Sequence, residues 1–221
     1  MRRATVVLPV VAMPPMLVIA ADPAGYSPFG PAKHLVASAC ALAGLALLVG
    51  AGRRLRGDRR LGWCWLALLV WMALASLVGV DRFHGFVGLP ERRLGWLTWL
   101  AFGLWFVIGQ SLESDERRWL VRGTVVAGVL AGGWAVLEGL GHPLVASASA
   151  SGRLTGSFGS AAYLGAASTL LVPVCVGGVL DRTEPKGWRS AGAMGAFLGS
   201  VACVGSGTRA VTIETVLPLS A

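Results

Sequence analysis

Residues 53–80 read RRLRGDRRLGWCWLALLVWMALASLVGV, in which five arginines precede an apolar run of twenty residues. At 1.5 Å per residue, a helix over 61–80 reaches about 30 Å, the thickness of the hydrocarbon core of a bilayer. A charge at the centre of such a span costs about 2.5–3.5 kcal/mol, which explains why the run has none. The stretch therefore predicts a transmembrane helix with a solvated cationic end.

The same alternation of apolar runs and short charged clusters continues through all 221 residues, of which 55% are hydrophobic and 14% charged. Mean hydropathy is +0.68. We predict an all-α polytopic transmembrane helical bundle, forming one transmembrane domain over residues 1–221. The seven complete spans are expected at about 4–21, 35–51, 61–80, 94–112, 119–137, 163–180 and 190–207.

Both ends of the chain allow alternatives. The first run resembles a signal peptide, but Pro9, Pro14 and Pro15 interrupt it and further spans follow, so we expect a retained first helix. The last stretch, AVTIETVLPLSA (210–221), would reach only about 18 Å as a helix. An eighth span thus begins without finishing. Either the chain is the N-terminal part of a longer protein, or its end lies along the membrane interface.

The net charge of +8 would suggest nucleic-acid binding in a soluble protein, but a basic stripe on a soluble face is missing here. The distribution of Lys and Arg instead indicates topology. With a cytoplasmic N-terminus, the cytoplasmic segments hold thirteen Lys and Arg residues and the outside segments six, as the positive-inside rule favours. We predict a multi-pass protein with a cytoplasmic N-terminus, membrane lipids as partners and no nucleic-acid partner.

This orientation places the arginines of VGLPERRLGW (87–96) outside, against the charge bias. Two interpretations remain open. The rule is statistical, and Asp81 and Glu91 partly neutralise this loop. Alternatively, Arg92 and Arg93 hold an anion at the outer surface.

The cysteines and glycines favour structural roles. Cys40, Cys64, Cys175 and Cys203 all fall inside apolar runs without metal-ligand spacing, so we expect no disulfide, metal site or cofactor. The pairs Gly128–Gly132 and Gly195–Gly199 have the small-residue spacing that lets membrane helices approach closely. We interpret both pairs as packing features.

Three ordered stretches resemble the O-antigen ligase / O-antigen polymerase-like family of bacterial membrane glycosyltransferases. They are SLVGVDRFHGFVGLPERRLGWLTWLAF (76–102), GRLTGSFGSAAYLGAASTLLVPV (152–174) and GSGTRAVTIE (205–214). The resemblance implies transfer of a glycan from an undecaprenyl-pyrophosphate carrier to an acceptor at the outer face of the bacterial inner membrane. It further implies that the chain is the N-terminal portion of a longer domain.

The chemistry implied by the resemblance suits arginine, because a fixed guanidinium stabilises the negative charge that develops on a departing diphosphate. Arg153 and Arg209 match the family's outside arginines and are the candidate carrier-pyrophosphate ligands, with Arg92 and Arg93 as weaker candidates. The family's acceptor-activating histidine has no counterpart here. His34, His84 and His142 are expected to be loop or interface residues, so we name no catalytic residue.

The chain departs from the family pattern after Phe158, where Ser160, Ala161 and Ala162 replace an Asn-Pro-Asn-like turn. Together with the unfinished eighth span, this leaves an incomplete or inactive transferase as one hypothesis and a non-catalytic membrane scaffold or degraded gene product as another. A transporter is a third alternative. The span centres carry almost none of the ionisable residues that a transport path uses.

Overall fold

The computed structural model describes residues 2–22, 29–52, 58–89, 94–145 and 152–208, with side chains in the first helix described from Leu8. Every regular element in these ranges is helical, as the sequence predicts. The helices are α1 (Arg2–Ile19), α2 (Gly30–Gly50), α3 (Arg59–Val78), α4 (Arg82–Val87), α5 (Trp96–Ser111), α6 (Ser114–Gly139), the 3₁₀ turn η1 (Gly156–Phe158), α7 (Ala161–Leu180) and α8 (Lys186–Gly205).

Each of the seven predicted spans coincides with one of these helices to within a few residues. Four helices in the described ranges, α2, α3, α6 and α7, are both long and apolar enough to cross a membrane. Helix α5 has only 16 residues, and glycines together with Lys186 and Arg189 dilute the apolar character of α8. The structure therefore supports a membrane protein, while the count of seven spans and the cytoplasmic N-terminus stay predictions.

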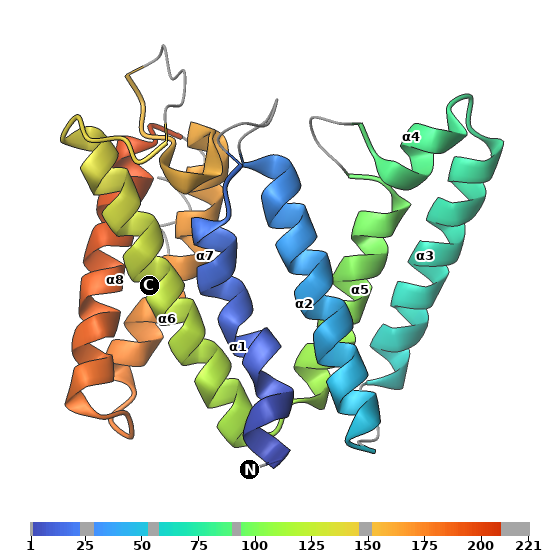
Figure 1. Ribbon diagram of the computed structural model, residues 1–221, viewed down its shortest axis with the longest axis horizontal. Helices are drawn as coiled ribbons and strands as arrows, with labels where there is room; N and C mark the ends of the chain where they lie inside the picture. Colours follow the sequence, from blue (N-terminus) through green and yellow to red (C-terminus); the bar gives the residue numbers. More distant parts are fainter. Residues whose placement is uncertain (1, 23–28, 53–57, 90–93, 146–151, 209–221) are drawn as a thin grey trace. The chain divides into compact units, whose positions relative to one another are not determined.

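The chain divides into two compact units. Unit 1 is Met1–Val10 with His34–Arg117, and unit 2 is Val11–Lys33 with Arg118–Ala221. In unit 1, α3 and α5 pack together, and α4, which lies in the segment that connects them, contacts both helices (Figure 1). Helix α3 has no buried residue, and its Trp63 and Trp71 are 69% and 71% exposed. So much exposed apolar surface on one helix fits contact with lipid better than contact with water.

Helix α4 was not anticipated, because the sequence predicts only a loop between the third and fourth spans. The Asp81 carboxylate starts this helix by accepting from the backbone N–H of His84 at 3.0 Å, and Gly88 ends it at φ 85°. The same carboxylate contacts His84 Nδ1 at 2.5 Å. These hydrogen bonds from His84 lower the pKa of Asp81. His84 was expected in a loop or at the interface, but it lies within this short helix.

In unit 2, α6, α7 and α8 run alternately up and down (Figure 1), and glycines let them approach closely. Cys175 Sγ on α7 lies where a Cβ on Gly128 of α6 or Gly195 of α8 would come within 2.7 and 2.8 Å of it. A Cβ on Gly132 would meet the backbone of Leu198 at 2.6 Å. The predicted packing role of both glycine pairs is confirmed, since Gly199 faces Val172 in the same way.

Helix α1 stays continuous through Pro9, Pro14 and Pro15. Proline has no N–H, so Pro15 leaves the carbonyl of Val11, four residues earlier, without its helical hydrogen bond. That carbonyl faces Gly123 of α6, where an added Cβ would come within 2.3 Å of the Val11 oxygen. A glycine on the neighbouring helix thus makes room for the backbone that proline disturbs, as membrane helices require.

The crossing of α6 and α8 generates a prediction. Gly132→Ala should destabilise the protein by about 1–3 kcal/mol, because the new methyl group meets backbone that cannot move aside. Its neighbour Gly133 has nothing within 4 Å of an added Cβ, so Gly133→Ala should be neutral or slightly stabilising. Thermal unfolding of the two variants in detergent measures the difference, and equal melting temperatures would contradict the close crossing.

Candidate functional site

The stretch Arg153–Ser160, RLTGSFGS, forms a turn that unites several elements of unit 2 ahead of α7. Two glycines give it its shape. Gly156 at φ 54° and Gly159 at φ 68° adopt the left-handed conformation that other residues rarely take. Thr155, Gly156 and Ser157 are buried, the last with no exposed area.

Glu138, near the end of α6, holds the start of this turn. Its carboxylate accepts from the backbone N–H of Thr155 at 3.0 Å, from the Thr155 hydroxyl at 2.8 Å and from the N–H of Gly156 at 2.6 Å. Buried backbone N–H groups need partners, and a carboxylate provides strong ones. Glu138 is thus the acceptor around which the turn folds.

Arg153 connects the turn to the end of α8. Its Nε donates to the carbonyl of Ser206 at 2.7 Å, and its Nη2 donates to the Thr208 hydroxyl at 3.3 Å. The adjacent Leu154 N–H donates to the carbonyl of Gly205 at 3.1 Å. The last carbonyls of a helix have no internal partner and carry partial negative charge, so a cation here is favourable. Arg153 remains exposed while its orientation is fixed.

Lys33 and two phenylalanines hold the other side of the turn. Lys33 Nζ donates to the carbonyls of Leu17, Val18 and Ala20 at the end of α1, the last two at 3.1 Å. The same ammonium lies 5.1 Å from the centre of the Phe158 ring. Phe29 packs so closely on Gly159 that a Cβ there would meet its ring at 2.3 Å. Cation–π contact and packing therefore fix the turn against α1 and the start of α2.

Of the predicted carrier ligands, only Arg153 lies in the described part of the chain; Arg92, Arg93 and Arg209 lie outside it. The Thr208 hydroxyl donates to the carbonyl of Ala161 at 3.2 Å, which joins the end of α8 to the start of α7. Arg153 and Thr208, the residue preceding Arg209 in the sequence, thus contact each other.

Two of the histidines make contacts of their own. His34 Nε2 contacts the Thr98 hydroxyl at 2.9 Å within unit 1, and His142 follows the end of α6. Glu138 and Lys33 are the positioning residues that sequence reasoning missed. Their only signal was a charge near the end of an apolar run, and nothing in the sequence connects Glu138 to Thr155, seventeen residues later.

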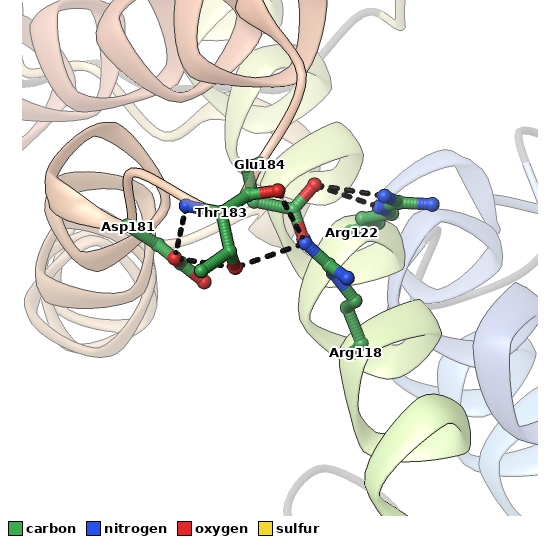
Figure 2. Close-up of polar contacts among 5 residues, drawn as sticks. All are labelled: Arg118, Arg122, Asp181, Thr183 and Glu184. Carbon is green, nitrogen blue, oxygen red and sulfur yellow. Dashed lines mark hydrogen bonds and ion pairs between the residues drawn. The ribbon is translucent and has the colours of Figure 1, made fainter.

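A second polar cluster lies where α6 begins and α7 turns into α8 (Figure 2). Glu184 pairs with Arg118 Nε through one oxygen, and with Arg122 Nη2 at 2.8 Å through the other. Arg118 Nη2 also donates to the carbonyl of Thr183 at 2.7 Å. The Asp181 carboxylate accepts from the Thr183 hydroxyl at 2.7 Å, which extends the network to Asp181.

The hydrogen bond from Arg118, followed by that from Arg122, lowers the pKa of Glu184 below its usual 4.5. Arg118 and Glu138 are twenty residues apart on α6, which is about 30 Å along a helix axis. The two polar clusters of unit 2 are therefore separated by about the thickness of a bilayer's hydrocarbon core.

Comparisons of this chain with protein-family models, with curated proteins and with solved structures give no match.

Glu138 provides a test of the turn. Glu138→Ala removes the acceptor of two buried N–H groups and a hydroxyl, each of which costs about 1–3 kcal/mol when left unsatisfied. We expect a lower melting temperature and faster proteolysis within 152–160. Glu138→Gln keeps one acceptor oxygen and should fall between Glu138→Ala and the unsubstituted protein. Asp115→Ala, which removes an exposed carboxylate from the start of the same helix, is the control. Equal loss in Asp115→Ala and Glu138→Ala would contradict the role of Glu138.

The Glu184 cluster predicts a dependence on pH. A carboxyl whose pKa is lower when folded stabilises the fold above its unfolded pKa, and this contribution disappears as pH falls through the folded pKa. Between pH 7 and pH 3, the melting temperature of the unsubstituted protein should therefore fall more than that of Glu184→Gln. Parallel pH curves for the two proteins would show that the ion pairs contribute nothing.

Proposed function

We propose that this chain is a membrane glycan transferase-like protein of the O-antigen ligase/polymerase type. Its substrate class is a glycan on an undecaprenyl-pyrophosphate carrier, and its working face is the outer face of the bacterial inner membrane. Four helices apolar enough to cross a membrane support a membrane location, and the ordered sequence stretches support the family. The carrier diphosphate is the anion that the outside arginines would bind.

The observation that carries the proposal is the state of Arg153. Its Nε is held by the end of α8, yet the residue is exposed, and its Nη2 contacts Thr208, next to Arg209 in the sequence. A cation fixed before its ligand arrives loses little freedom on binding, so preorganisation of this kind favours anion recognition. A planar guanidinium also matches a phosphate better than an ammonium does.

One observation favours the alternative of a non-catalytic scaffold. The bonds from Arg153 to Ser206 and Thr208 satisfy the end of α8, which would be reason enough to place an arginine there. Both roles are compatible with the contacts, but they predict different effects on carrier binding. A carrier site needs the fork of the guanidinium, whereas the helix end needs only a positive donor.

Carrier binding separates the two roles. The full chain in detergent is titrated with undecaprenyl diphosphate, and with undecaprenyl monophosphate for comparison. Arg153→Lys retains a donor for Ser206 but loses the fork, so the diphosphate should bind roughly tenfold more weakly while the melting temperature changes little. Arg209→Gln should weaken binding similarly. Arg82→Gln, an exposed arginine expected on the same side, is the control.

Unchanged diphosphate affinity in Arg153→Lys and Arg209→Gln would reject the carrier site and favour the non-catalytic scaffold.

Cysteine labelling tests the membrane side independently. With an impermeant maleimide on intact cells, Leu144→Cys should react and Arg182→Cys should react only after permeabilisation. Leu144 is 59% exposed and lies on the turn side of unit 2. The reverse labelling pattern would place Arg153 in the cytoplasm and reject the proposal.

A further inference from the structure

Five cationic side chains gather at the end of unit 2 opposite the 153–160 turn. This basic end comprises Arg118, Arg122, Arg182, Lys186 and Arg189. Two carboxylates, Asp181 and Glu184, lie among them, so these seven side chains have a net charge of +3. A net positive charge at one end of a helix long enough to cross a membrane calls for an anionic partner.

Glu184 holds two cations of the basic end in place, and the net charge of this end remains positive. Arg118 and Arg122 are four residues apart on α6, so they share a face and repel each other. The Glu184 side chain, 8% exposed, lies between the two guanidinium groups and removes that repulsion (Figure 2). Arg118 remains 39% exposed, compared with 15% for Arg122. One carboxylate thus fixes two cations and leaves one of them at the surface.

Two indole rings lie beside Arg122 in the basic end. The Arg122 guanidinium carbon lies 4.6 Å from the Trp119 ring centre and 5.3 Å from that of Trp188. Trp119 is 49% exposed. Tryptophan beside arginine is typical of the headgroup layer of a membrane, where the ring contacts acyl chain and glycerol while the cation contacts phosphate.

The turn between α7 and α8 adds the cations that face outward. Arg182 and Lys186 are exposed and flank Thr183 and Glu184, both of which are bonded to Arg118. Arg189 is anchored instead, since its Nε donates to the carbonyl of Val179 at 3.0 Å. Arg182, Lys186 and the exposed part of Arg118 are therefore the groups positioned to receive an anion.

We propose that the basic end binds the headgroup phosphate of an anionic phospholipid, with Arg182, Lys186 and Arg118 as its ligands and Trp119 against the glycerol region. Cations of this kind at a helix end and half-exposed tryptophan together match a lipid headgroup, whereas a free phosphate would have no use for the indole. The inference stands apart from the carrier proposal, because it concerns the opposite end of unit 2 and different residues.

Native mass spectrometry tests it. The full chain in dodecyl maltoside is titrated with phosphatidylglycerol or with phosphatidylcholine of the same acyl chains, and the retained lipid is counted. We expect phosphatidylglycerol to be retained preferentially. Arg182→Gln/Lys186→Gln should weaken its retention about tenfold. Arg59→Gln/Arg60→Gln, two exposed arginines at the start of α3, removes the same charge and should have a much smaller effect.

Three outcomes would overturn the inference: equal retention of the two lipids, equal loss in the two double variants, or displacement of the lipid by an equal concentration of inorganic phosphate. Equal retention of the two lipids would mean that the turn is only solvated. Equal loss in the two double variants would indicate an unspecific effect of charge, and displacement by phosphate would indicate a site for free phosphate. Far-ultraviolet circular dichroism verifies that each variant is folded. If the double variant unfolds, Arg182→Gln and Lys186→Gln singly should each reduce retention about threefold.

Discussion

The carboxylate of Glu138 accepts the hydrogen bonds that allow the backbone of residues 155–157 to be buried. Residues 155–157 lie inside unit 2, away from water, and a buried N–H without a partner is costly. Regular helices satisfy such groups internally, but this turn cannot, because its glycines leave helical geometry at two positions. Glu138 accepts from Thr155 and Gly156, and the arrangement of Arg153 and Phe158 follows from that fixed point.

The same requirement explains how α1 and α8 meet their neighbours. Proline in α1 leaves the Val11 carbonyl without an internal partner, and Gly123 lets α6 approach it. The end of α8 exposes its last carbonyls, and Arg153 and the Leu154 N–H bind them. In each case an irregular piece of backbone is accommodated by another segment of unit 2. Small residues at the α6–α7–α8 contacts make this possible, because bulky side chains would hold the helices apart.

Unit 2 thus carries polar structure at both ends and apolar packing between them. Glu138 and Arg118 mark these ends on one helix, about 30 Å apart along its axis. At one end the cations are anchored to carbonyls of α1 and α8, and at the other they are anchored to Glu184. Arg153 is exposed at the first end, and Arg182 and Lys186 are exposed at the second. Our proposals therefore assign the carrier diphosphate to the first end and a phospholipid headgroup to the second.

The sequence by itself determined the helices, since long uncharged runs between charged clusters permit little else, and all seven expected helices lie where those runs are. It also determined the role of the spaced glycines, because close packing depends on a local pattern. The sequence placed Arg153 in the segment ahead of the span at 163–180 but could not predict its bonds to Ser206 and Thr208. Nor could it predict that Glu138 would hold Thr155 or that Glu184 would pair with Arg122. Those contacts join residues 17 to 62 positions apart, and only the packing of α6, α7 and α8 brings them within hydrogen-bonding distance. Helix formation depends on neighbours in sequence, whereas a polar site depends on neighbours in space.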